Sequence, residues 1–127
     1  MKADFSKRVL IADNESDTVE SLRIVLSGYG YETLTAANGE EAIAVAKETS
    51  PDAIILDVAM PKVDGFEVSK RLRSIPNLAE TVIVGVSGFG QKEFVDRAKD
   101  AGMDFYLLKP AEIEELVSCL NSKLKTS

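Results

Sequence analysis

Short apolar runs alternate along this chain with longer stretches in which apolar residues recur every three or four positions. Because side chains repeat every two residues in a strand and every 3.6 in a helix, this alternation predicts strands separated by helices. The expected strands are residues 8–12, 31–37, 53–57, 81–86 and 104–108. The pattern therefore predicts an α/β fold.

The run at residues 53–57 (AIILD) is apolar at successive positions and lies between Pro51 and Pro61. It is too short for a helix, and a strand with this pattern is buried on both faces, as in a parallel sheet. Asp57 closes the run at its carboxyl end, the edge where open α/β sheets bind ligands. An aspartate after a strand can also simply cap the next turn, so other residues must decide its role.

Helical periodicity follows each predicted strand. Two helix starts carry a capping residue with an acid three positions later, at Asn38 with Glu41 and at Asp64 with Glu67. Glycines close the first and fourth helices. The apolar positions that face the core come from five helices: Val19, Leu22, Val25 and Leu26 before Gly28; Ala42, Ile43 and Ala46; Val68, Leu72 and Ile75; Phe94, Ala98 and Ala101 before Gly102; and Ile113, Leu116, Val117, Leu120 and Leu124.

Five strands joined through five helices by short connections predict a parallel sheet that is covered on both faces. Right-handed crossovers then give a doubly wound (βα)5 sandwich with the flavodoxin-like strand order 2-1-3-4-5. With 127 residues, 45% of them hydrophobic, the chain has material for one core. We therefore predict a single domain over residues 1–127.

Composition narrows the chemistry. The net charge of -6, from 15 basic and 21 acidic residues, offers no overall attraction for nucleic acid, and the basic cluster at residues 70–73 is interpreted as a solvated helix face. No apolar run is long enough to span a membrane, and residues 1–8 lack the apolar core of a signal peptide, so a cytoplasmic location is expected. Because the chain has no histidine, its chemistry must use carboxylates, lysine or hydroxyls.

Polar residues follow four of the predicted strands. Since parallel strands end at the same edge of a sheet, these residues are expected in one site: Asp13, Asn14, Asp57, Ser87 and Lys109. Neighbouring carboxylates repel unless a cation lies between them, and Mg2+ is a hard cation that prefers oxygen ligands. A lysine and a hydroxyl suit the oxygens of a phosphoryl group. The set supplies the parts for forming an aspartyl phosphate.

At this point the sequence resembles the receiver domain of two-component response regulators over essentially its full length. The motifs that carry the resemblance are residues 9–15 (VLIADNE), 55–61 (ILDVAMP) with Asp64-Gly65, 86–88 (VSG) and 106–110 (YLLKP). The resemblance implies a signalling domain, not an enzyme, whose Asp57 accepts a phosphoryl group from a sensor histidine kinase or a histidine phosphotransfer protein. It further implies a cis peptide bond between Lys109 and Pro110.

The resemblance also implies a role for each residue of the site. Mg2+ would be held by Asp13, Asn14, Asp57 and the backbone carbonyl of Ala59, while Ser87 and Lys109 would contact the phosphoryl oxygens. Tyr106 would change rotamer as Ser87 moves. That change would reshape the face formed by the fourth helix, fifth strand and fifth helix, which would bind a downstream protein, an output domain or a second phosphorylated copy of the chain.

Three positions depart from the family pattern. Asn14 stands where the family usually has a second acid, so weaker Mg2+ binding is expected. The resemblance implies that Ala59 and Phe89 flank the path of the hydrolytic water, and neither side chain can hold a water by hydrogen bonding. We therefore expect a comparatively long-lived phosphoryl group.

Three other functions fit parts of the sequence. A pseudo-receiver would use the fold as a protein-binding scaffold, with Asn14 marking a weakened metal site. An aspartyl phosphatase would usually carry a second acid two residues after the nucleophile, where this chain has Ala59. Nucleotide or flavin binding fits the fold, although residues 13–16 (DNES) lack the glycines that let a backbone approach phosphate.

Overall fold

A computed structural model describes residues 7–60 and 63–124 of the chain. Pro61, the predicted boundary of the loop after Asp57, and residues 1–6 lie outside these ranges. Strands and helices alternate throughout the described part, in this order: β1 (Arg8–Ala12), α1 (Ser16–Gly28), β2 (Glu32–Ala36), α2 (Gly39–Thr49), β3 (Ala53–Asp57), α3 (Gly65–Arg73), a 3₁₀ turn η2 (Pro76–Leu78), β4 (Val82–Ser87), α4 (Lys92–Asp100), β5 (Phe105–Leu108) and α5 (Ile113–Lys123). None of the helices in these ranges combines the length and apolar character that a membrane crossing needs.

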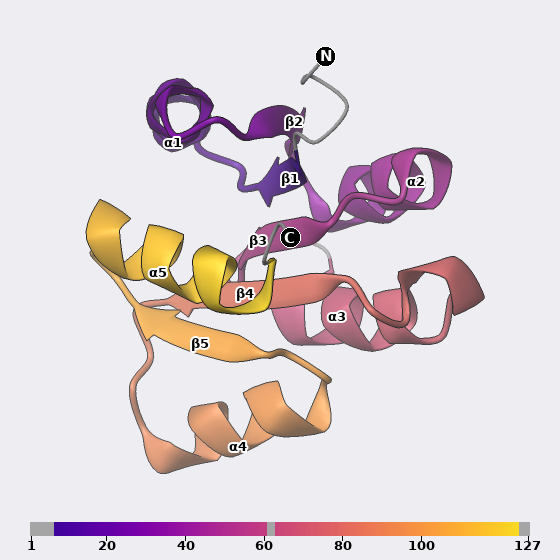
Figure 1. Cartoon of the computed structure of the whole chain (residues 1–127). Coiled ribbons are helices and arrows are strands. Elements are labelled where there is room, and N and C mark those ends of the chain that lie inside the picture. Colours follow the sequence, from indigo (N-terminus) through magenta and orange to yellow (C-terminus); the bar gives the residue numbers. More distant parts are fainter. Residues whose placement is uncertain (1–6, 61–62, 125–127) are drawn as a thin grey trace.

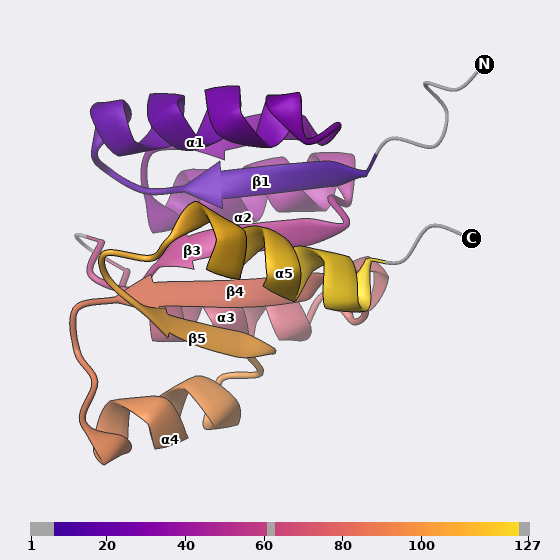
Figure 2. The ribbon, with the colours of Figure 1, turned by 60° about the vertical axis from the view of Figure 1, so that its left-hand side comes forward.

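The strands form one parallel sheet in the order β2-β1-β3-β4-β5, which confirms the predicted flavodoxin-like topology. α1 and α5 cover one face of the sheet, and α2, α3 and α4 lie on the other (Figures 1 and 2). The register places Asp57 beside Val86, and Ala12 beside Leu56. The carboxyl ends of the central strands therefore lie level with one another.

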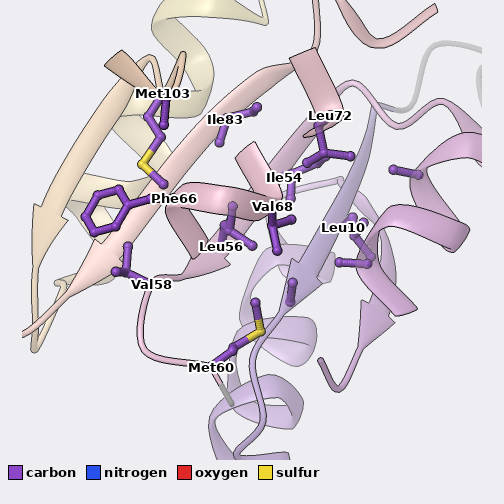
Figure 3. Close-up of a cluster of buried hydrophobic side chains, with 14 of the residues drawn as sticks. Leu10, Ile54, Leu56, Val58, Met60, Phe66, Val68, Leu72, Ile83 and Met103 are labelled. Atoms are coloured by element: carbon purple, nitrogen blue, oxygen red, sulfur yellow. The ribbon is translucent and has the colours of Figure 1, made fainter. Parts of the chain in front are cut away.

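The sheet divides the apolar interior into two clusters, one on each face. Every residue of β3 is buried, because this strand lies between β1 and β4 and its successive side chains enter opposite clusters. Leu10, Ile54 and Leu56 enter the cluster beneath α2 and α3 (Figure 3). Ile11 and Ile55 enter the cluster beneath α1 and α5. The rigid centre of the sheet thus ends on Asp57.

The helix caps follow the sequence at both predicted capping residues. Asn38 Oδ1 accepts the backbone N–H of Glu41 at 2.8 Å, and Asp64 Oδ1 accepts that of Glu67 at 2.9 Å. Each bond satisfies an otherwise unpaired amide of a first helical turn. The β3–α3 connection therefore ends in a fixed helix start, close in sequence to Asp57.

The first helix closes at Gly28, as predicted, but a second glycine provides the left-handed cap. Gly28 is the last residue of α1, whereas the left-handed residue is Gly30, with φ at +96°. Gly30 N–H donates to the carbonyl of Ser27, and Tyr31 N–H to that of Leu26, which is the Schellman pattern. The fourth helix, α4, ends at Asp100 and is closed by the left-handed Gly102, φ +86°, as predicted.

The third helix is shorter than its apolar pattern suggested. α3 ends at Arg73, and Ile75 lies outside it, before η2. Pro76 accounts for this boundary, because proline disfavours helical backbone at the preceding residue and has no N–H to donate. Ile75 nonetheless packs against the core.

Arg73 does not belong to a solvated face, so that interpretation of residues 70–73 is wrong at this position. Its guanidinium donates to the carbonyls of Gly102, Leu78, Ala79 and Thr81 and to Asp104 Oδ2, at distances of 2.7 to 3.2 Å. The carbonyls belong to the loops that precede β4 and β5. Arg73 therefore joins the end of α3 to the nearby segment before β4 and to the sequence-distant loop before β5.

Candidate functional site

The carboxyl ends of β3 and β5 bring Asp57 and Lys109 into contact. Lys109 Nζ lies 3.2 Å from Asp57 Oδ1. Asp57 is the last residue of β3 and is 5% exposed, whereas the Lys109 side chain is 39% exposed. The Lys109–Pro110 peptide bond is cis, as the resemblance implied. A buried carboxylate is thus paired with a lysine that still reaches solvent.

The loop after Asp57 is fixed by backbone hydrogen bonds. Ala59 N–H donates to Asp57 Oδ1 at 3.1 Å. Val58 N–H donates to the carbonyl of Val86, and Val58 O accepts the N–H of Gly65 at 2.9 Å. Gly65 packs so closely that a Cβ there would lie 2.6 Å from Val58 Cα. Gly65 belongs to one of the sequence motifs, but the motif alone does not indicate this close approach.

Asp13 lies beside this pair, directly after β1. It is 7% exposed, and its Oδ1 accepts the N–H of Glu15 at 2.9 Å. Burial raises the pKa of the Asp13 carboxyl above its usual value, and the negative charge of Asp57 raises it further, while the bond from Glu15 and the charge of Lys109 oppose the shift. The two carboxylates therefore carry more negative charge than one lysine balances.

The donor set fits a hydrated Mg2+ ion. No three acidic, histidine or cysteine side chains cluster at metal-binding distance in residues 7–60 and 63–124, so a site built from carboxylates alone is not present there. Asp13 and Asp57 supply two buried carboxylates, and Asn14 adds an exposed amide at the same edge. Mg2+ commonly uses one or two carboxylates and retains several waters. These residues, with the carbonyl of Ala59, could hold such an ion.

A cavity of about 510 Å³ opens beside Asp13 and Lys109, between the starts of α1 and α5. Glu15 and Thr18 line it together with Leu22, Leu116 and the Pro110-Ala111 segment. Glu15 and Thr18 were not predicted as site residues. The alternation of strands and helices could have indicated them, since both lie where α1 begins at the ligand-binding edge.

Ser87 and Tyr106 both bind the backbone of Phe89. Ser87 is fully buried, and its Oγ accepts the N–H of Phe89 at 3.0 Å. Tyr106 Oη donates to the carbonyl of Phe89 at 2.6 Å. The Tyr106 ring stacks against Phe66 at 6.2 Å and lies 3.4 Å from where a Cβ on Gly85 would be. One residue of the β4–α4 loop therefore connects the buried hydroxyl to the tyrosine.

The side chain of Phe89 lies with the aromatic residues of α4. It is 44% exposed, and its ring stacks on Phe94 with a centroid distance of 4.9 Å. Gly88 leaves open space, since a Cβ there would meet nothing within 4 Å. The effect of Phe89 on the lifetime of the phosphoryl group stays a prediction.

Comparison with known proteins identifies the family. The model of the response regulator receiver domain matches residues 9–121. The chain belongs to this family. Receiver domains are signalling domains of two-component systems that interact with histidine kinases and downstream effectors, and they typically bind Mg2+.

Individual relatives agree with this assignment. The polar-differentiation response regulator DivK of Brucella anthropi is 30% identical over 118 residues, which cover 93% of this chain and 96% of DivK. The transcriptional regulatory protein PrrA of Mycobacterium leprae is 38% identical over 122 residues, but the match covers only 51% of that protein. Among solved structures, the chemotaxis protein CheY4 of Vibrio cholerae aligns with a TM-score of 0.88 at 32% identity, covering 93% of this receiver and 98% of CheY4.

Proposed function

We propose that this receiver domain accepts a phosphoryl group on Asp57 from a phosphohistidine. The observation that carries the proposal is the pairing of a buried strand-end carboxylate with Lys109 at 3.2 Å. A carboxylate that is held in place can act as a nucleophile without first losing conformational freedom.

The contacts of Asp57 suggest which oxygen attacks phosphorus. In the described residues, Ala59 N–H and Lys109 Nζ both approach Oδ1, which leaves Oδ2 as the nucleophile. Oδ2 forms a bond to phosphorus while the bond from phosphorus to the imidazole nitrogen breaks. The electron pair of the broken bond stays on that nitrogen. Lys109 remains protonated and binds a phosphoryl oxygen. The Ser87 hydroxyl can donate to another while its Oγ still accepts the Phe89 N–H.

Asp13, Asn14, Asp57 and the carbonyl of Ala59 would hold Mg2+ in this site. The bound ion would neutralise negative charge on the transferring group. The raised pKa of Asp13 supports this part of the proposal, because a cation would relieve the repulsion between the two carboxylates. Asn14 contributes no charge, so Mg2+ binding should be weaker than with an acid at this position.

The phosphoryl group should be comparatively long-lived. Ala59 is exposed beside Asp57, and it has no side-chain donor or acceptor with which to orient a water molecule. Phe89 is equally unable to do so. The half-life of phosphorylated protein, followed by intact mass after removal of the donor, tests this expectation. Loss of the phosphoryl group within seconds would contradict it.

The proposal extends to partners and location. A sensor histidine kinase or a histidine phosphotransfer protein would supply the phosphoryl group in the cytoplasm. The α4-β5-α5 face would bind a downstream protein, an output domain or a second copy of the chain. In this function the domain assists only its own phosphorylation and dephosphorylation and is not an enzyme.

Phosphorylation with a small donor tests the main proposal. The protein is incubated with Mg2+ and acetyl phosphate and its intact mass is measured, with Asp57→Asn as the matched control. We expect one phosphoryl group on the wild type and none on the variant. A mass increase that persists in Asp57→Asn, or that is absent from both proteins, would refute the role of Asp57.

A pseudo-receiver scaffold is the second candidate, and Asn14 is the observation that favours it. Such a scaffold would use the same fold to bind proteins without taking up phosphate. The retained group of Asp57, Ser87 and Lys109 argues for phosphorylation instead. The two functions differ in one measurable respect, because the scaffold would show no phosphorylation at any Mg2+ concentration.

A further inference from the structure

Helix α4 has few apolar contacts with the body of the domain. Of its nine residues only Ala98 is buried, while Phe94 and Val95 are partly buried. By comparison, the nine-residue α3 buries five residues. The aromatic contacts of α4 are those of Phe94, whose ring stacks on Phe66 of α3 at 6.4 Å and on Phe89 at 4.9 Å. Its attachment therefore depends on a small number of side chains.

Arg97 adds a cationic contact from α4 to the start of α3. Its guanidinium carbon lies 4.3 Å from the centroid of the Phe66 ring and 6.0 Å from that of Phe94. Phe66 is 4% exposed, whereas about half of the Arg97 side chain remains exposed. A guanidinium over an aromatic face is attracted by the negative face of the ring.

Asp64 adds an ion pair to the contact between Arg97 and Phe66. Arg97 Nη2 lies 3.8 Å from Asp64 Oδ2, while Asp64 Oδ1 caps α3 by accepting the N–H of Glu67. An exposed ion pair at this distance contributes little on its own. Its geometric effect is to keep the guanidinium over Phe66. The ring contact and the carboxylate thus hold Arg97 from two sides.

This contact lies a short covalent distance from the proposed phosphoacceptor. Phe66 follows Gly65, whose N–H donates to Val58 O and whose backbone packs against the carbonyl of Asp57. A displacement of the loop after Asp57 would therefore be passed to the ring on which Arg97 rests. Through its contact with this ring, Arg97 would pass the displacement on to α4.

We propose that Arg97 clamps α4 onto the start of α3 and so controls how readily α4 detaches from the sheet. The clamp itself requires no phosphorylation. Its coupling to Asp57 rests on the proposed function. If phosphorylation of Asp57 changes the stability of the clamp, then by linkage the clamp must change the free energy of phosphorylation by the same amount. Local opening of a weakly packed helix is a low-energy event that does not require the sheet to unfold.

Hydrogen exchange of the α4 backbone amides in the full chain tests the clamp. We expect Arg97→Gln to accelerate their exchange by about two- to fivefold, the range given by an exposed cation–π contact. Arg97→Lys, which keeps the charge, should lie between the variant and the wild type. Lys99→Gln, which removes an exposed cation from the same helix, is the control and should leave the exchange unchanged. Equal acceleration in Arg97→Gln and Lys99→Gln, or none in either, would overturn the proposal.

A double-mutant cycle isolates the ring contact. Phe66→Leu and Arg97→Gln should be non-additive, because either change removes the same interaction. Additive effects on α4 exchange would show that Arg97 acts without Phe66 and would overturn the clamp. Exchange of the β3 amides, measured in the same experiment, shows whether Phe66→Leu has disturbed the sheet. Asp64→Asn, which keeps the cap oxygen and removes the charge, gives the contribution of the ion pair.

The coupling to Asp57 is measured with acetyl phosphate and Mg2+ as the probe. Phosphorylation should change α4 exchange in the wild type, and Arg97→Gln should reduce that change. An unaltered change in Arg97→Gln would refute the coupling. If intact mass shows no phosphoryl group, the proposed function fails, whereas the clamp is still decided by the exchange of the unphosphorylated proteins.

Discussion

Replacing Gly65 by alanine should move the loop that carries Asp57. The added Cβ would lie 2.6 Å from Val58 Cα and 2.9 Å from the carbonyl oxygen of Asp57. Optimal carbon contacts are at about 3.5–4.0 Å, so the backbone must shift by roughly 1 Å. Both atoms belong to the main chain, so no side-chain rotation can relieve the clash. The helix start or the acceptor loop has to give way.

The expected loss of stability follows from this crowding. Overpacking costs about 1–3 kcal/mol, and the better helix propensity of alanine returns up to about 1 kcal/mol. With a mid-range overpacking cost of about 2 kcal/mol, the net cost is about 1–2 kcal/mol. With 127 residues and about 2.1 cal/mol/K of unfolding entropy per residue, Tm should fall by roughly 4–7 °C. A 1 Å displacement of the nucleophile should also slow phosphorylation by about 100-fold.

Thermal unfolding by circular dichroism measures the stability, and intact mass with acetyl phosphate and Mg2+ gives the phosphorylation rate. Gly28→Ala is the matched control, because a Cβ at the end of α1 would meet nothing within 4 Å. It should raise Tm slightly and leave the rate unchanged. If Gly65→Ala unfolds and reacts like the wild type, the close approach of Gly65 does not position Asp57.

Three further predictions concern the charged residues. Asn14→Asp should lower the Mg2+ concentration needed for phosphorylation by about tenfold, since it adds a charged ligand, and an unchanged titration would contradict this. Because burial raises the folded-state pKa of Asp13, the stability that its protonated form provides is lost as pH rises through that pKa. Asp13→Asn should therefore have a higher Tm than the wild type at pH 7 without divalent ions, with the gap closing below about pH 4, and a gap that does not depend on pH would refute this cause. Arg73→Lys should lower the free energy of unfolding by about 3 kcal/mol, since lysine cannot reproduce the guanidinium fork that donates to four carbonyls. Arg71→Lys, in an exposed ion pair, is the control and should cost under about 1 kcal/mol. Equal shifts in Tm for the two variants would rule out the proposed role of Arg73.

The sequence predicted the strand order and the convergence of Asp13, Asp57, Ser87 and Lys109 because both follow from local patterns. Apolar runs identify buried strands, and parallel strands bring their ends to one edge. The family match confirms the resemblance. The roles of the individual site residues, and the extent of a single domain over residues 1–127, stay predictions.

The features that the sequence did not reveal depend on backbone conformation and on contacts between separate segments of the chain. Arg73 is held by carbonyls of the loops before β4 and β5. The periodicity of α3 carries no information about these loops. The choice between Gly28 and Gly30 depends on which residue adopts positive φ. The close approach of Gly65 to Val58 likewise appears only when the β3–α3 connection folds back. Periodicity gives the face of an element but not its partner.

Gly85 and Met103 have a consequence for how this receiver can change during evolution. A Cβ on Gly85 would lie 2.5 Å from Met103 Sδ, so the methionine fills the volume that a side chain on β4 would otherwise take. Overpacking and cavity formation are both costly in an interior of this density. A larger residue at position 85 should therefore be tolerated only with a smaller one at 103. Homologous receivers should show the two positions varying as a pair. The Tyr106 ring, which would lie 3.4 Å from a Cβ on Gly85, should limit which pairs are tolerated.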